Sequence, residues 1–170
     1  TPCTSQSAVV QVTRTIAPNA GADASVTVCN TMAQFALFNL LGGGPNATGS
    51  WLDPVQQPFS GTFTPGSSTP GVYAYVVSGS GPCASDTGFV TVQVNVQPSA
   101  GISASIFVCD SQVPFALIGQ LGGSPTVGGS WTGPNNTSSN GTFDPSSSVE
   151  GNYTYTVVAL SPCVDVSSVV

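Results

Sequence analysis

The sequence predicts an all-β protein built from tandem β-sandwich modules of about 80 residues. Three observations support this prediction. Charged residues make up only 5% of the chain, while Val, aromatic residues, Gly (20) and Pro (14) are common, a mixture that suits short half-buried strands joined by turns. Several segments, such as 71–77, alternate along the chain with a period of two. The sequence also repeats itself at an offset of 80 positions.

The scarcity of basic residues excludes several classes of function. Arg14 is the sole base, Lys and His are absent, and the net charge is −6. Binding to nucleic acid or to an anionic membrane surface depends on Lys and Arg, so we expect neither partner. No apolar run approaches the roughly 20 residues that a membrane span needs, so we expect no membrane insertion of this segment.

The internal repeat fixes the predicted domain organisation. Residues 17–90 and 97–170 align without gaps and are identical at 31 of 74 positions, which indicates tandem duplication of a whole domain. We expect residues 1–16 to be the last strand of a preceding repeat, 17–96 to be a complete repeat, and 97–170 to be a repeat that stops before its last strand is complete. On this interpretation the parent chain continues in both directions.

The link between the two repeats is short and contains proline. Residues 97–101 match 17–21, and five residues with a stiff proline leave little slack. We therefore expect neighbouring repeats of the same chain to be partners in a fairly rigid rod. Each module would add roughly 35–40 Å if strands of about ten residues run along it.

The cysteines fall near the start and near the end of each repeat. The pairs predicted on this basis are Cys29–Cys83 and Cys109–Cys163, with Cys3 paired outside this sequence. Each bridge would close a loop of about 55 residues and contribute roughly 4 kcal/mol. Disulfides indicate an oxidising, extracellular compartment. The alternative is that each repeat holds two free buried thiols.

Strands are expected wherever apolar residues recur with a period of two. In 71–77 the residues Tyr73, Tyr75 and Val77 share one face, and in 89–96 the valines at even positions point inward. Turns at Gly, Pro and Ser clusters separate these strands. In chain order the strands predicted for the first repeat are 25–29, 35–40, 49–52, 61–63, 71–77 and 89–96, with equivalents 80 positions later.

About seven short strands and one Trp per 80 residues are typical of an Ig-like β-sandwich. The predicted core residues are Trp51, Trp131, Tyr73, Tyr75, Tyr153 and Tyr155. An alternative role for the two tryptophans is to form exposed platforms for stacking sugars. Their identical position after Gly-Ser in both repeats favours the core.

No catalytic, cofactor or metal site is expected. Acid–base catalysis needs two titratable groups within reach of each other, but no pair of carboxylates recurs between the repeats. The serines have no His or Lys that could activate them. Zinc has no ligands once the cysteines are paired. Calcium binding stays open, although Asp144 with Glu150 offers few of the clustered oxygen ligands that it needs. We therefore predict no enzyme and no cofactor.

The motifs of the repeat resemble those of very large surface proteins of Bacteroidetes. They include Pro-Asn-Ala-Gly-x-Asp (18–23), Val-Thr-Val-Cys (26–29), Phe-x-Leu-Phe-x-Leu-Leu-Gly-Gly (35–43), Gly-Ser-Trp (49–51), Gly-Thr-Phe-x-Pro (61–65), Gly-Val-Tyr-x-Tyr (71–75) and Pro-Cys (82–83). Among the proteins with similar repeats are the gliding-motility adhesins of the SprB type. The second repeat has Ser103 where the first has Asp23, a departure from the opening motif.

This resemblance implies a secreted chain at the cell surface, exported by type IX secretion. The function expected from it is that of a structural repeat segment of an adhesin filament or stalk, linked to gliding motility. Other filament chains or surface glycans would then be further partners. Two alternatives are a glycan- or protein-binding Ig-like module and an ancillary repeat region of a secreted enzyme. The same repeat type occurs in proteins with different roles, so it does not by itself fix one.

Overall fold

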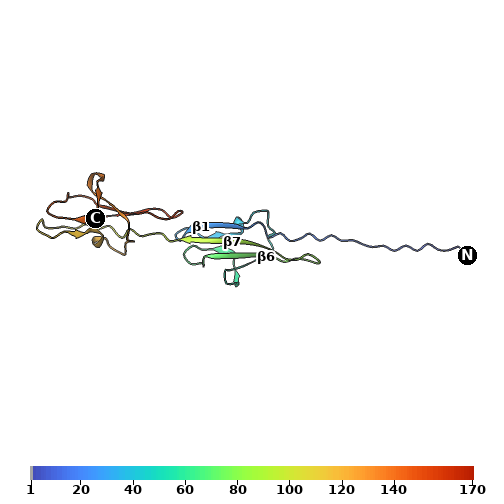
Figure 1. Cartoon of the computed structure of the whole chain (residues 1–170). Helices are drawn as coiled ribbons and strands as arrows, with labels where there is room; N and C mark the ends of the chain where they lie inside the picture. Colours follow the sequence, from blue (N-terminus) through green and yellow to red (C-terminus); the bar gives the residue numbers. More distant parts are fainter. Residues whose placement is uncertain (1) are drawn as a thin grey trace. The chain divides into compact units, whose positions relative to one another are not determined.

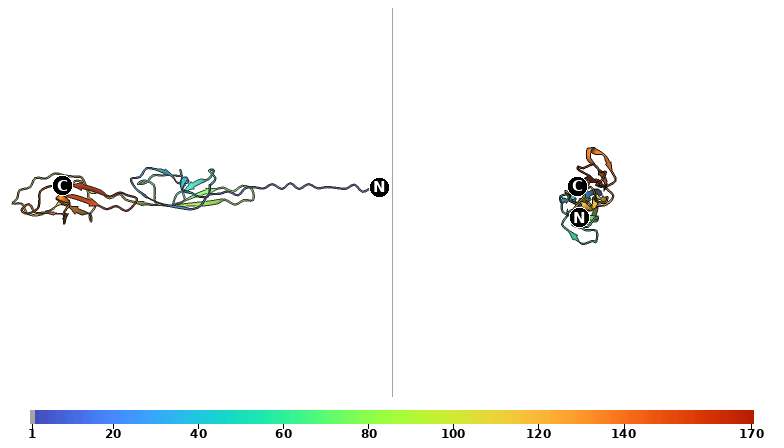
Figure 2. Two further views of the ribbon diagram at one scale, coloured as in Figure 1. Left: turned by 90° about the horizontal axis from the view of Figure 1, so that it is seen from above. Right: turned by 90° about the vertical axis from the view of Figure 1, so that its left-hand side faces the viewer.

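The computed structural model describes residues 2–170, which form an all-β protein with short strands and three 3₁₀ turns (Figure 1, Figure 2). In the first sequence repeat, 17–96, the elements are β1 (Ala24–Cys29), β2 (Phe35–Ala36), η1 (Leu37–Leu40), β3 (Ser50–Leu52), β4 (Pro58–Phe59), β5 (Thr62–Phe63), β6 (Gly71–Val77) and β7 (Asp86–Asn95). Strands were expected at most of these places. Within 35–40, however, only two residues are extended, and the rest forms the 3₁₀ turn η1.

Two sheets make up the first repeat. The larger has the order β1-β7-β6-β3-β4, and the smaller pairs β2 with β5. The hairpin of β6 and β7 is the longest pairing, running from Gly71 opposite Val92 to Val77 opposite Asp86. Apolar residues at every second position of these strands point to the interior, as in Tyr73, Tyr75 and Val77.

Strand β1 runs parallel to β7. Ala20 N donates to Asp86, and Phe89 N donates to Asp23, so the partners lie 66 positions apart in both cases. At the far end, Asn30 N donates to the carbonyl of residue 95, a separation of 65. A nearly constant separation means that both strands advance in the same direction. The C-terminal end of β1 therefore lies beside the C-terminal end of β7.

The sandwich is Ig-like in strand order and in its landmark residues. Trp51 lies in the middle of β3 and is buried. Near the start of β6, the Tyr73 hydroxyl donates to the carbonyl of Thr69 at 2.6 Å, the arrangement known as a tyrosine corner. Antibody domains carry a cysteine two residues after this tyrosine, but here that position is Tyr75. The bridge that joins the two sheets of an antibody domain through the core is therefore not possible at this position.

The second repeat, 97–170, has the same plan with fewer paired residues. Its elements are β8 (Phe115–Ala116), η2 (Leu117–Gln120), β9 (Ser130–Thr132), η3 (Pro134–Asn136), β10 (Ser138–Ser139), β11 (Thr142–Phe143), β12 (Thr154–Val157) and β13 (Val166–Val169). They form sheets of order β10-β9-β12-β13 and β11-β8. The strand expected at 105–109 is absent, and only Ala104 N donates to β13 there, at Val169 O. In the first repeat the matching residues pair with the C-terminal half of β7, whose equivalents would come after Val170.

Aromatic residues fill the core of each sandwich. All six aromatic residues assigned to the core from the sequence are between 1% and 9% exposed: Trp51, Tyr73, Tyr75, Trp131, Tyr153 and Tyr155. Each indole packs against the second tyrosine of the same repeat, with ring centroids 4.9 Å apart in the first repeat and 5.0 Å in the second. The hydroxyl of this second tyrosine donates to one loop carbonyl and accepts from one glycine N–H in both repeats.

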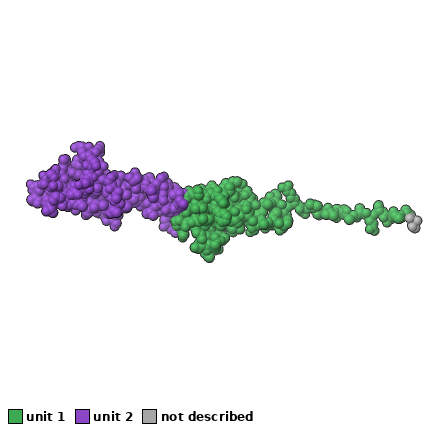
Figure 3. Space-filling model, in the orientation of Figure 1, with its two compact units in different colours: residues 1–26, 35–63, 69–92 green, residues 27–34, 64–68, 93–170 purple. Residues whose placement is uncertain are grey.

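The chain divides into two compact units whose boundary differs from the boundary between the sequence repeats (Figure 3). Unit 1 comprises residues 1–26, 35–63 and 69–92, whereas unit 2 comprises 27–34, 64–68 and 93–170. The C-terminal ends of β1 and β7 thus belong to the same unit as the second repeat. Residues 2–16 form no strand and are exposed, while their equivalents include β7.

Candidate functional site: the junction between the sequence repeats

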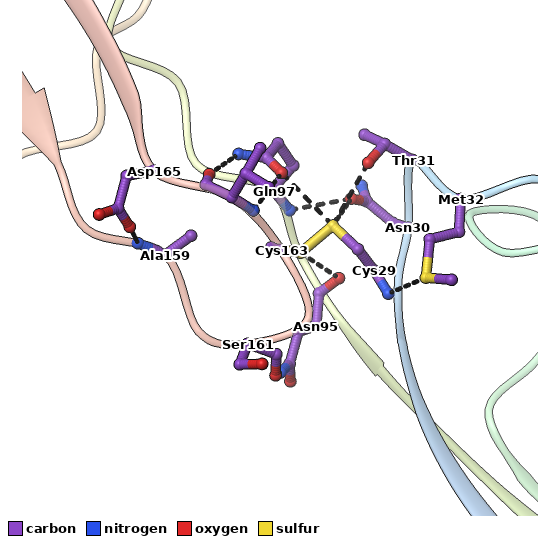
Figure 4. The surroundings of a disulfide bond; sticks show 11 residues. Cys29, Asn30, Thr31, Met32, Asn95, Gln97, Ala159, Ser161, Cys163 and Asp165 are labelled. Carbon is purple, nitrogen blue, oxygen red and sulfur yellow. Dashed lines mark hydrogen bonds between the residues drawn. A yellow bond between two sulfur atoms is a disulfide. The ribbon is translucent and has the colours of Figure 1, made fainter.

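The disulfide of this protein joins the two sequence repeats. Cys29, at the end of β1, is bonded to Cys163, in the turn before β13, with a Cα–Cα distance of 4.9 Å and a sequence separation of 134 (Figure 4). Both residues belong to unit 2. The predicted pairings Cys29–Cys83 and Cys109–Cys163 were therefore wrong. Cys83 and Cys109 are free thiols, as is the exposed Cys3.

The parallel pairing of β1 with β7 explains why the two cysteines of one repeat do not form a disulfide with each other. Cys29 lies beside the C-terminal end of β7, whereas Cys83 lies in the turn that precedes it. A ten-residue strand separates these ends by about 30 Å. Two cysteines cannot be bridged when their Cα atoms are more than about 7 Å apart. The second repeat follows the same rule, because Ala104 is opposite Val169 and Cys109 lies further along, away from Cys163.

Asn30 binds both the last residue of β7 and the first residue of the inter-repeat link. Its backbone N–H donates to Asn95 O at 2.9 Å, and its side-chain oxygen accepts from Gln97 N at 2.8 Å. The neighbouring Thr31 hydroxyl donates to the Cys29 sulfur at 3.4 Å. The turn after β1 therefore binds the link next to the disulfide, as Figure 4 shows.

The same link is fixed to the second repeat from its other side. The Gln97 amide nitrogen donates to Val164 O, and its oxygen accepts from Val164 N at 3.3 Å. The Asn95 amide nitrogen donates to Ser161 O at 2.8 Å, and Asn95 O lies 3.5 Å from the Cys163 sulfur. Residues 95–97 are thus bound by polar groups of both repeats. We call the disulfide together with Asn30, Asn95 and Gln97 the junction.

The junction joins the two sequence repeats through one covalent bond and several hydrogen bonds. In the loop-entropy description, a bridge that closes a loop of 134 residues stabilises the folded chain by about 5 kcal/mol. The side-chain amides add hydrogen bonds to backbone groups of the link. A disulfide is also typical of proteins from non-reducing compartments.

Part of the junction is predictable from the sequence. Cys29 and Cys163 were both expected to form disulfides, but each with a different partner. The polar character shared by Asn30 and its equivalent Asp110 was visible in the repeat alignment, yet it did not reveal that Asn30 binds the link. Gln97 gave no such signal, because the equivalent residue is Ala17.

A cavity of about 390 Å³ in the second repeat is part of its core. The lining includes Val108, Leu117, Phe143, Tyr153 and Val170. The equivalent residues of the first repeat, 80 positions earlier, are all at most 2% exposed. The cavity is therefore the counterpart of a filled core and carries no sign of a ligand site.

The described residues bring together no set of metal ligands, and a few of their titratable groups have a shifted pKa. Across residues 2–170, no group of three or more His, Cys, Asp or Glu residues could hold a metal ion. Burial raises the pKa of Tyr73, and the nearby charge of Asp53 raises it further. The pKa of the Cys109 thiol is lowered, chiefly because the Ser111 hydroxyl donates to its sulfur at 3.3 Å.

The tryptophans have the geometry of core residues, not of a sugar-stacking platform. Trp51 is 7% exposed and Trp131 is 9% exposed, so neither ring offers a free face. Gly61, with φ +83°, sits directly on the first indole, since a Cβ there would lie 2.7 Å from Trp51 Cδ1. A sugar ring has no access to a face covered in this way.

Comparisons with known proteins give a structural neighbour. No family model and no curated protein matches the chain. Among solved structures, an I-band fragment of titin, I67-I69, is similar over 91% of this chain, with 17% sequence identity and a TM-score of 0.45. The chain spans 65% of the length of that fragment. The Ig-like assignment depends on the strand order and on the Trp and Tyr landmarks described above.

The helical turns η1, η2 and η3 contain three or four residues each. No helix in the part of the chain that the structure describes has the length and apolar character needed to cross a bilayer.

Proposed function

We propose that this chain is a structural segment of an extracellular repeat protein, in which successive Ig-like modules are joined so that they transmit force. The observation that carries the proposal is the junction: a disulfide between the two sequence repeats, next to a link that both repeats bind. A flexible tether would need none of these contacts. The tryptophans are buried, so they stabilise the modules and leave no face for a stacked sugar.

Small-angle X-ray scattering of the oxidised chain tests this proposal. Two modules of roughly 35–40 Å in line predict a radius of gyration of about 23 Å. A compact globule of this length would have a radius of gyration of about 16 Å. The extended residues 2–16 would inflate the value, so a variant that begins at Ala17 is the matched control. A radius of gyration of about 16 Å or less for that variant would refute an in-line arrangement.

The more specific part of the proposal concerns the parent protein. The motif resemblance supports a cell-surface adhesin filament or stalk of the SprB type, exported by type IX secretion and connected with gliding. Antibodies against residues 17–170 would then label intact, unpermeabilised producing cells, and the label would move along their surface. Labelling confined to permeabilised cells would contradict this location.

A glycan-binding role is the main competitor, and a direct measurement separates it from the structural one. We expect the oxidised chain to give no saturable signal on an array of surface glycans. A signal abolished by Phe107→Ala, which truncates a fully exposed aromatic residue, would support a binding module instead. Phe38→Ala serves as a control, since this ring packs on Tyr75 within the fold.

A further inference from the structure

The free thiols Cys83 and Cys109 lie in turns that share hydrogen bonds with the turns of the two bonded cysteines. Cys83 N donates to Ser80 O at 3.2 Å, as Cys163 N donates to Leu160 O at 2.9 Å. The two turns, 80 positions apart, thus share the backbone hydrogen bond that the cysteine N–H makes.

The segment that faces this turn is also at an equivalent position of the repeat. The Cys83 sulfur lies 3.8 Å from Thr15 O, and the Cys163 sulfur lies 3.5 Å from Asn95 O. Thr15 and Asn95 are 80 positions apart. Thr15 thus contacts the Cys83 turn as Asn95, the last residue of β7, contacts the Cys163 turn.

Cys109 likewise repeats the geometry of Cys29. In both turns, the N–H three residues later donates to the cysteine carbonyl at 3.0 Å. A hydroxyl two residues later donates to the sulfur, from Thr31 at 3.4 Å and from Ser111 at 3.3 Å. Cys109 is exposed and Cys83 is half-buried, so both thiols are accessible to a partner.

From this equivalence we infer a general pairing rule: the first cysteine of each repeat bonds to the second cysteine of the following repeat. Cys109 would then bond to the counterpart of Cys163 in a following copy of the repeat, and Cys83 to the counterpart of Cys29 in a preceding copy. Each bond spans 134 positions, whereas the repeat period is 80, so successive loops overlap. The repeats are then joined by a series of overlapping disulfide loops, which we call the ladder. This inference deepens the proposed structural role and rests on its tandem-repeat part.

The bond forms by ordinary thiol oxidation. The two thiols lose two protons and two electrons in total, and these reduce one small disulfide, such as oxidised glutathione, to two thiols. The Cys109 sulfur attacks as the thiolate, a mixed disulfide forms, and the partner thiol then displaces the glutathione. The hydrogen bond from Ser111 stabilises that thiolate.

The ladder limits how far the chain can be stretched. From the second cysteine of one repeat to the first cysteine of the next is 26 positions, as from Cys83 to Cys109. Under the pairing rule, the shortest covalent path along two repeats consists of these 26 positions and one disulfide. That path is about 95 Å long when it is fully stretched. Two folded modules of roughly 35–40 Å each already span about 70–80 Å. If each repeat instead held its own bridge, the shortest covalent path along a single repeat would already reach about 95 Å when fully stretched.

A duplicated chain tests the rule. Thr1–Val170 is followed directly by residues 11–170 of a second copy, because Gln11 is equivalent to the position after Val170. After refolding with a glutathione couple, the chain is digested with pepsin at acid pH, which suppresses disulfide exchange. Trypsin is unsuitable, since Arg14 is the sole basic residue. Non-reducing mass spectrometry then identifies the cross-linked peptides.

We expect a bond between Cys109 of the first copy and Cys83 of the second, and Cys29–Cys163 bonds in both copies. Cys109→Ser in the first copy should remove only the new bond and free one thiol for alkylation. A bond between Cys109 and Cys163 of the first copy would overturn the rule, as would an unpaired Cys109 beside intact Cys29–Cys163 bonds. Scattering on the same samples separates this outcome from the proposed function, because an in-line chain without the new bond refutes only the ladder.

Discussion

Pulling the chain by its ends is a stringent test of the observed disulfide. With Cys29 bonded to Cys163, tension cannot pass through residues 30–162, because the shorter covalent path runs across the bridge. Unfolding of either sandwich then adds no length from within this loop. Only the residues before Cys29 and after Cys163 can be drawn out.

The magnitude follows from the sequence separation. At about 3.5 Å per residue, the 134 positions inside the loop correspond to roughly 470 Å of extended chain, of which the bridge itself spans 4.9 Å. Reduction should therefore lengthen the fully stretched chain by about 46 nm in one piece. Bridges within each repeat would instead withhold two loops of 54 positions from extension, from 29 to 83 and from 109 to 163. Reducing each of them would add about 19 nm of contour length.

Single-molecule force spectroscopy between tags at the two termini gives this length directly. The oxidised chain is stretched first, reductant is added, and the contour length is measured again. Cys163→Ser should give the long contour without reductant. Cys83→Ser is the matched control, because it removes a free thiol and should leave the oxidised contour unchanged.

Two results would refute the reasoning. One is a gain in two steps of about 19 nm instead of one of about 46 nm. The other is a longer oxidised contour in the Cys83→Ser variant, which would mean that Cys83 takes part in the bridge.

Three further predictions concern the fold and the free thiol. Tyr155→Phe removes a buried hydroxyl that bonds two backbone groups and should lower the free energy of unfolding by about 1–3 kcal/mol, measured by denaturant titration. Gly61→Ala, at φ +83° and against an indole, should lower the free energy of unfolding by roughly 2–4 kcal/mol. Gly44→Ala, at φ +65° in open space, should lower it by about 1 kcal/mol. Equal decreases for the two variants would argue against the packing explanation. Ser111→Ala removes the hydrogen bond that lowers the pKa of Cys109, so the pH midpoint of its alkylation rate should move upward; an unchanged midpoint would mean that the hydroxyl does not stabilise the thiolate.

The sequence by itself determined the repeat period, the all-β class and the aromatic core. These properties are encoded locally or by self-comparison. The alternation in 71–77 places Tyr73 and Tyr75 on one face whatever the rest of the chain does. The offset of 80 then transfers the same assignment to Tyr153 and Tyr155. Their burial depends on the period of two and on their size, which are both visible in the sequence.

Only the tertiary structure decided which cysteines meet. The answer depends on β1 running parallel to β7, a pairing between segments whose partners lie 66 positions apart and that the composition and periodicity of either strand leave open. An antiparallel β1 with the same residues would have brought its end toward the turn that holds Cys83. The parallel direction carries Cys29 to the opposite end, about 30 Å away, where the next repeat supplies Cys163. The strand sequences stay the same in both cases, but the direction of one strand turns a bridge within a domain into a bridge between sequence repeats.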